Sequence, residues 1–162
     1  MDKKTKRKGD GVKLRVMSLG GLEEIGKNMT VLEYGDDIVV IDCGIGFPDD
    51  DMLGIDLVIP DVSYLEENSD KIRGLVLTHG HEDHIGSIAY LLRSVNVPVY
   101  GTRLTLGLVE HKLKEHNLLS KVNLVRTKAG ETVKCSFTTP SVAAYKAPST
   151  KCSSAEVRAA SS

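Results

Sequence analysis

Three histidines and two acidic residues lie close together in the segment THGHEDHIG, residues 78–86. Imidazole nitrogens and carboxylate oxygens are common zinc ligands, and His79, His81, Asp83 and His84 spell H-x-H-x-D-H. Alternate side chains on an extended loop point the same way, so His79 and His81 can bind one metal ion. Asp83 and His84, where a helix begins, can reach a second ion. Two ions about 3.5–4 Å apart can share a hydroxide and stabilise both oxygens of an in-line displacement, so this segment predicts a hydrolytic metal centre.

The alternative is a polar loop whose histidines only form hydrogen bonds. Three histidines and an aspartate at this spacing, directly after an apolar strand, favour the metal centre. Asp42 ends a neighbouring predicted strand and could orient a ligand histidine as a carboxylate behind the metal ligands. The alternative interpretation of Asp42 is a turn residue that ends a strand and has no role at the metal centre. His111 and His116 lie in a Lys/Glu-rich helix, so we expect them to be solvated.

Two further segments invite a binding hypothesis. Residues 21–28, GLEEIGKN, resemble a phosphate-binding loop. That motif needs Ser or Thr directly after the lysine, here Lys27, and then a helix. Asn28 and a strand-like MTVLEY stand there, so we interpret the segment as a glycine turn. The second segment is a loop with four aspartates, which predicts a charged loop or a site for a hard cation such as calcium or manganese. These are Asp49, Asp50, Asp51 and Asp56.

The metal-ligating segment needs a framework of strands and helices. GLVLT, an apolar run, predicts a buried strand that leads directly into His79. Gly35-Asp36 separates two β-rich runs and indicates a hairpin. We expect strands at 12–19, 29–34, 37–42, 74–78, 97–101 and 121–127, and helices at 60–70, 85–95 and 102–117, the last with Thr102 as N-cap. Strands that alternate with helices in this order predict a mixed α/β sheet with helices packed against it.

Composition sets the remaining limits. The chain has 162 residues, which suits one domain, and 41% of them are hydrophobic. Residues 1–8 hold five Lys/Arg and one Asp, so residues 1–11 are expected to form a disordered basic tail, or alternatively a weak electrostatic arm for phosphates. The net charge of −1 argues neither for nor against a nucleic-acid partner.

Cysteine usage and the N-terminus bear on location. The three cysteines, Cys43, Cys135 and Cys152, form no CxxC pair, which predicts neither a disulfide framework nor a Cys-based zinc site. The N-terminus lacks the apolar region of a secretory signal, and no run approaches a membrane span. We therefore expect a cytoplasmic protein that does not contact membranes.

Residues 135–162 differ in character from the rest of the chain. They are rich in Ser, Ala, Thr and Lys, and they have no clear periodicity and no histidine. Such a composition predicts a disordered or poorly packed tail.

Four longer segments, one of which contains the metal-ligand motif, resemble the sequence of a known protein family. They are LGGLEEIGKNMTVLEY, IDCGIGFPDDDMLGIDLVIPD, LTHGHEDHIGS and VPVYGTRLTLGLVEHKL. From about Leu14 to Lys134 the chain resembles the N-terminal part of the bacterial ribonuclease J family, within the β-CASP group of metallo-β-lactamase-fold proteins. One departure is Glu23, where the family usually has glycine.

The resemblance implies an αββα sandwich with a two-zinc site, of which residues 12–134 would form the N-terminal part. It also implies a β-CASP domain that closes over RNA, with 5′-to-3′ exonucleolytic and endonucleolytic hydrolysis in RNA decay and rRNA processing. His79 and His81 would bind one zinc and Asp83 and His84 the other. Asp83 would also steer the nucleophilic hydroxide or receive its proton. Complete members usually form homo-oligomers.

The family completes its site with ligands that lie further along the chain, and no histidine follows His116. Our hypothesis is that residues 135–162 are read out of frame and that this chain alone has little activity. Two alternatives stay open. The first is another hydrolase of the same fold that acts on a thioester or lactam, and the second is a non-catalytic product that binds RNA.

Overall fold

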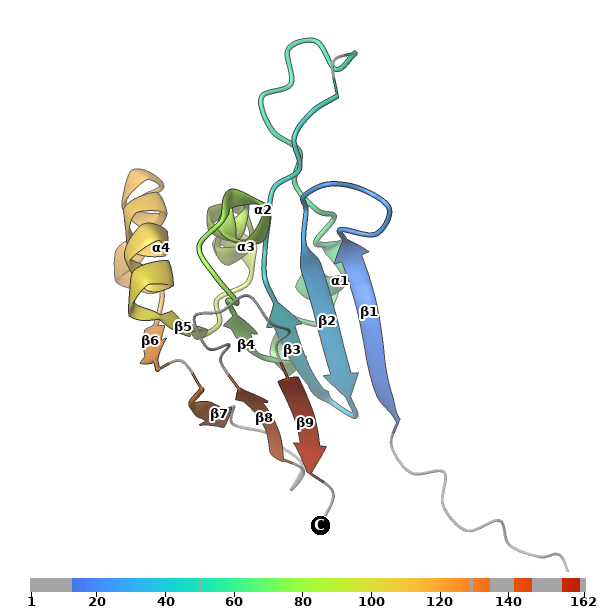
Figure 1. The fold of residues 1–162 in the computed structure, drawn as a ribbon, viewed down its shortest axis with the longest axis vertical. Coiled ribbons are helices and arrows are strands. Elements are labelled where there is room, and N and C mark those ends of the chain that lie inside the picture. The colour runs from blue at the N-terminus through green and yellow to red at the C-terminus, as the bar shows by residue number, and fades with distance from the viewer. Residues whose placement is uncertain (1–12, 50, 129, 135–141, 147–155, 161–162) are drawn as a thin grey trace, which may run out of the picture.

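A computed structural model of the chain describes residues 13–49, 51–128, 130–134, 142–146 and 156–160. Its main feature is a six-stranded sheet in the order β1-β2-β3-β4-β5-β6 (Figure 1). The strands are β1 (Leu14–Gly20), β2 (Met29–Tyr34), β3 (Asp37–Ile41), β4 (Ile72–Val76), β5 (Val99–Thr102) and β6 (Leu124–Thr127). The helices are α1 (Ser63–Glu67), α2 (Glu82–Ile85), α3 (Ile88–Ser94) and α4 (Arg103–Glu115), with 3-10 turns η1 (Ser69–Lys71) and η2 (Leu119–Lys121).

The sheet changes direction at β3. Strands β1, β2 and β3 run antiparallel, and β3 to β6 run parallel. The predicted hairpin is confirmed, because Tyr34 pairs with Asp37 across the turn at Gly35-Asp36. The predicted mixed α/β sheet is also confirmed.

All the helices pack on the same face of this sheet. From β3 to β6, each strand lies beside the one that precedes it in the chain, always on the same side. Crossover connections between parallel strands are right-handed, so the helices in these connections lie on one face of the sheet. One core cluster accordingly joins Leu65 of α1, Leu91 of α3 and Leu106 of α4 to the strand residues Val40 and Leu75. This layer of helices on a sheet agrees with the expected metallo-β-lactamase-type fold.

The helix expected at 85–95 begins only at Ile88 as α3, because the chain turns at Gly86-Ser87, and the short helix α2 precedes that turn. Ser87 is buried, its N–H donates to the Cys43 carbonyl oxygen at 3.0 Å, and its hydroxyl donates to the Gly44 carbonyl oxygen at 2.8 Å. These bonds tie the turn to the segment after β3, a non-local contact that helical periodicity does not reveal. The Thr102 N-cap is confirmed, since its hydroxyl accepts from the N–H of Thr105.

A second sheet follows, in the order β7-β8-β9. Its strands are β7 (Thr132–Lys134), β8 (Val142–Lys146) and β9 (Glu156–Ala160), all antiparallel. Two stretches of the tail that we expected to be disordered are therefore strands, because backbone pairing between neighbouring segments does not need the apolar periodicity that the composition lacks. The rest of 135–162, Cys135 and Cys152 included, lies outside the described residues, as does the basic tail at 1–11.

The connections at one edge of the sheet position the candidate site. The β1–β2 loop, the segment after β3 and the segment between β4 and α2 all leave the sheet at this edge (Figure 1). Within the described part of the chain, no helix has the length and apolarity needed to cross a bilayer.

Candidate metal centre

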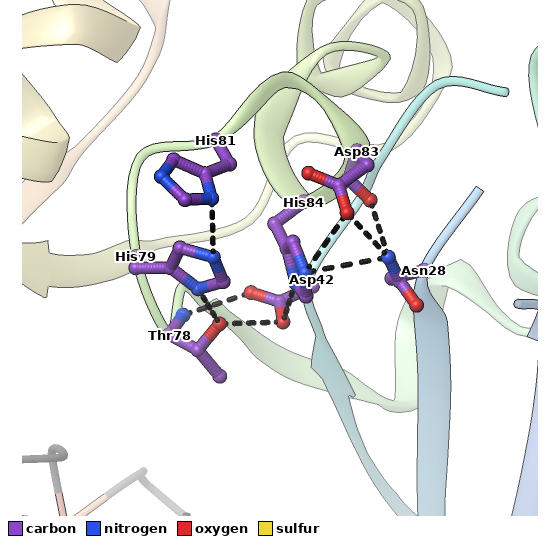
Figure 2. Close-up of polar contacts among 7 residues, drawn as sticks. All are labelled: Asn28, Asp42, Thr78, His79, His81, Asp83 and His84. Atoms are coloured by element: carbon purple, nitrogen blue, oxygen red, sulfur yellow. Dashed lines mark hydrogen bonds and ion pairs between the residues drawn. The ribbon is translucent and has the colours of Figure 1, made fainter. Parts of the chain in front are cut away.

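Three separate segments build the site, and parallel pairing of β3 with β4 aligns two of them. Asp42 follows β3 and Thr78 follows β4. The Asp42 N–H donates to the Val76 carbonyl oxygen at 2.9 Å, and the Thr78 N–H donates to Asp42 Oδ1 at 2.8 Å. Asn28, the last residue before β2, reaches the same place from the third segment. Figure 2 shows these side chains facing the histidines.

His79 and His81 form the first donor pair. His79 Nε2 lies 3.2 Å from His81 Nδ1 (Figure 2). Two nitrogens that bind one tetrahedral zinc at about 2.0–2.1 Å stand about 3.3 Å apart. The separation of this pair therefore fits two ligands of a single metal ion.

Asp83 and His84 form the second donor pair. Asp83 Oδ2 lies 3.3 Å from His84 Nε2, again close to the edge of a zinc tetrahedron. The His79 and His84 rings lie against one another, with centroids 4.0 Å apart, so the two pairs adjoin. The chain thus brings all four predicted ligands together as two pairs.

Neither donor pair is joined by a third candidate ligand among the described residues. Within that part of the chain, no group of three or more His, Cys, Asp or Glu side chains could hold a metal ion. The donor types and the two separations fit zinc, but each pair supplies only two of the four bonds that zinc takes.

Asp42 is buried and orients two of the histidines, His84 directly and His79 through Thr78. Its Oδ2 accepts from His84 Nδ1 at 2.8 Å and from the Thr78 hydroxyl at 2.7 Å. Because the Thr78 hydroxyl proton is used there, its oxygen accepts from His79 Nδ1 at 2.9 Å. Both imidazoles then carry their proton on Nδ1 and present an Nε2 lone pair, the form that binds a metal.

The backbone at Asp42 supports this role. Its φ of 61° lies in the left-handed region, which aspartate tolerates better than most residues. Left-handed aspartate at a buried position is uncommon, and here it aims the carboxylate back at the β4 end. Strain of this kind is often found at functional sites.

The histidine pKa values move in opposite directions. Burial, together with the neighbouring imidazoles, lowers the pKa of His79. Burial also acts to lower the pKa of His84, but the hydrogen bond and charge of Asp42, with the charge of Asp83, outweigh it and raise that pKa. His79 is therefore neutral and available to bind a cation over a wider pH range than His84.

The other candidate residues lie apart from this cluster. His111 is exposed and pairs with Glu115, as expected for a solvated residue. His116 is partly exposed, accepts from Arg93 at 2.9 Å and lies against the Tyr90 ring, apart from the metal ligands. Asp49, Asp51 and Asp56 are exposed, and Asp50 lies outside the described residues.

Two further residues of the site, Thr78 and Asn28, were not predicted from the sequence. Thr78 directly precedes the ligand motif, and its role follows only from the alignment of β3 with β4. Asn28 belongs to the segment that we interpreted as a simple glycine turn, and its side chain contacts Asp83 and His84. Only the fold brings this segment to the metal ligands.

A close backbone contact holds the second pair in place. A Cβ on Gly44 would lie 1.6 Å from the Asp83 carbonyl oxygen, so no larger residue fits there. The Cys43 N–H donates to the His84 carbonyl oxygen at 2.7 Å, and the Asn28 N–H donates to the Asp83 carbonyl oxygen at 3.1 Å. The segment after β3 and the end of the β1–β2 loop thus clamp Asp83 and His84 from two sides.

A sequence model of the metallo-beta-lactamase superfamily matches residues 23–144. The chain belongs to this superfamily. It is 50% identical to Ribonuclease J of Synechocystis sp. over 122 residues, which are 75% of this chain and 19% of that protein. It is 55% identical to Ribonuclease J 1 of Streptococcus pyogenes over 103 residues, which are 64% of this chain and 18% of that protein. The resemblance to the ribonuclease J family is confirmed, and the chain spans about a fifth of the length of these relatives.

A solved structure supports the fold. The chemotaxis sensor ODP, in a peroxy diiron form, matches with a TM-score of 0.54 and 14% identity, covering 92% of this chain and 55% of that one. At this identity the likeness concerns the fold alone.

Proposed function

We propose that this chain carries part of the metal centre of a zinc-dependent ribonuclease of the ribonuclease J type. One observation carries the proposal: two donor pairs with zinc-like separations, 3.2 and 3.3 Å, adjoin each other. Ribonuclease J relatives about 50% identical to the chain support the choice of RNA as substrate.

In this proposal, His79 and His81 hold one ion, and Asp83 and His84 hold the other. A bound divalent ion supplies a Lewis acid and a water molecule of lowered pKa. Asp42 and Thr78 keep the imidazole protons on Nδ1, so the Nε2 lone pairs face the ions. The Asp83 carboxylate, partly exposed at the same place, would also orient the attacking water or accept its proton.

Further parts of the proposal follow from the relatives. The reaction would be hydrolysis of RNA phosphodiester bonds, both 5′-to-3′ exonucleolytic and endonucleolytic, with roles in rRNA processing and RNA decay. We propose a cytoplasmic protein that does not contact membranes, and we expect homo-oligomers of the complete family protein. Zinc is favoured over manganese or calcium because imidazole nitrogens make up three of the four ligands.

The test transfers the described core into a longer relative. Residues 13–134 of this chain would replace the matching segment of the Synechocystis ribonuclease J, and the chimera would be assayed on 5′-monophosphorylated RNA and on a thioester. We expect RNA cleavage that needs a divalent metal, is lost in His81→Ala and is unchanged in His111→Ala, an exposed histidine outside the cluster. Cleavage of the thioester alone, or RNA cleavage that survives His81→Ala, would contradict the proposal.

A further inference from the structure

The Gly-rich β1–β2 loop, residues 21–28, has no role in the proposed function so far. Its last residue, Asn28, lies beside the second donor pair (Figure 2). The Asn28 side-chain amide nitrogen, Nδ2, lies 3.0 Å from the Asp83 carbonyl oxygen, 3.2 Å from Asp83 Oδ2 and 3.3 Å from His84 Nε2. One carboxamide thus contacts both members of the Asp83–His84 pair, and no such contact joins it to His79 or His81 in the described structure.

The backbone of Asn28 is fixed by neighbours that are distant in sequence. Its N–H donates to the Asp83 carbonyl oxygen at 3.1 Å, and its carbonyl oxygen accepts from the Gly44 N–H at 3.1 Å. The preceding residue, Lys27, donates its N–H to the Ile45 carbonyl oxygen at 2.8 Å. The side chain is therefore presented from a backbone that is already attached to both sides of the site.

The loop also leaves space for this carboxamide. Gly21 has a φ of 82°, and a Cβ there would lie 2.7 Å from Asn28 Oδ1. The Lys27 ammonium pairs with Glu24 at 2.7 Å, and Glu24 accepts from the Gly21 N–H at 3.1 Å. These contacts close the loop on itself and keep Gly21 against Asn28.

We infer that Asn28 is a positioning residue for the second donor pair, a role that rests on the proposed metal-binding function. Donation from Nδ2 restrains the Asp83 carboxylate before a metal ion binds, and the Nδ2 contact with His84 Nε2 gives way when the single lone pair of that nitrogen binds the ion. Restraining ligands in advance raises metal affinity, and loss of such a partner behind the ligands typically costs about 10–100-fold in affinity. The effect should fall on the Asp83–His84 pair and spare the His79–His81 pair.

The test is a zinc titration of the 162-residue chain, followed by the imidazole ¹⁵N resonances of its five histidines. These resonances report each pair separately, and His111 and His116 serve as internal references. In Asn28→Ala, we expect the zinc concentration at half-saturation of His84 to rise about tenfold or more. That of His79 and His81 should not change, which also shows that the variant is folded.

Two further variants make the test specific. Asn68→Ala removes an amide that likewise donates to a main-chain oxygen, that of Tyr64, and whose side-chain contacts in the described structure are with Tyr64 and Lys71 and not with a metal ligand, so it should leave both steps unchanged. Gly21→Ala keeps Asn28 but crowds its carboxamide, so it should reproduce the selective loss at His84.

The outcomes separate this inference from the proposed function. If the wild-type chain binds zinc at both pairs and Asn28→Ala weakens both equally, or neither, the role of Asn28 is overturned and the metal centre stands. If zinc moves no resonance of His79, His81 or His84 in the wild-type chain, the metal centre is overturned, and the role of Asn28 with it.

Discussion

Two loops leave the same edge of the six-stranded sheet and differ sharply in how they are held. The metal loop, residues 78–84, accepts hydrogen bonds from Asn28 and Cys43 and donates one to Asp42, all of which lie on other segments. The apolar loop, residues 47–59, extends away from the sheet (Figure 1). It exposes five large apolar side chains, and its described backbone bonds are mostly local, such as Met52 N–H to Asp49 O at 2.9 Å. The exposed side chains are Phe47, Met52, Leu53, Ile55 and Ile59.

The difference shows that the composition of a loop does not determine how many hydrogen bonds hold it to the rest of the chain. The metal loop is the more polar of the two, yet it is the one tied to two other segments. Its side chains are positioned because their backbone is fixed from outside the loop.

The largest expected effect is the loss of the close approach at Gly44. Gly44→Ala places a Cβ where the Asp83 backbone lies, so we expect a destabilisation of at least about 3 kcal/mol or failure to fold. Gly54→Ala in the apolar loop meets no atom within 4 Å, and its φ of 82° should cost about 1–2 kcal/mol. Urea unfolding of the two variants measures both values, and equal destabilisation would break the comparison.

The Cys43 thiol should be protected from alkylation, because the Cys43 backbone is hydrogen-bonded to His84 and Ser87. Burial raises the pKa of Cys43 to about 12, since the Ser87 hydrogen bond only partly offsets it. Alkylation at pH 8 should therefore be at least about 100-fold slower at Cys43 in the folded chain than in urea. A raised thiol pKa also means that its contribution to stability is present below about pH 9 and is lost as the pH rises toward 12. Peptide mapping after iodoacetamide treatment gives the rate, and rapid labelling of the folded chain would show that the clamp opens.

Removing the charge of Asp42 should weaken metal binding without changing the backbone. Asparagine tolerates the φ of 61° there, but it cannot supply the carboxylate that accepts from His84 and Thr78. Zinc affinity of Asp42→Asn should fall about 10–100-fold by calorimetric titration. Asp56→Asn, in the apolar loop, serves as the control, and an equal loss in both variants would contradict a specific role for Asp42.

The smallest effect concerns Glu23 in the β1–β2 loop. Its φ of 55° is unfavourable for glutamate, and the ribonuclease J resemblance implies glycine at this position. Glu23→Gly should stabilise the chain by about 0.5–1 kcal/mol, because relief of the left-handed strain exceeds the added flexibility of the unfolded chain. Thermal unfolding measures the change, and a lower melting temperature would show that the loop gains from glutamate.

Much of the framework was predictable from the sequence, since apolar runs and the Gly35-Asp36 turn mark the strands directly. The boundaries failed where distant segments intervene, as at Ser87, whose bonds to Cys43 and Gly44 hold a turn where the predicted helix was expected to begin. Antiparallel pairing at β8 and β9 was missed because composition, not periodicity, dominated that prediction.

The four predicted ligands are local in sequence, so their spacing alone was sufficient to nominate them. Asp42 was nominated only as the end of a neighbouring strand. Thr78 and Asn28 could not be nominated, because their contacts depend on which strand lies beside β4 and on where the β1–β2 loop ends.

X-ray absorption at the zinc edge of the zinc-loaded 162-residue chain tests the central claim most directly. We expect nitrogen and oxygen ligands at about 2.0–2.1 Å, with imidazole scattering that falls in a variant lacking His79 and His84 and persists in His111→Ala. Sulfur ligands at about 2.3 Å, or imidazole scattering unaffected by loss of His79 and His84, would contradict it.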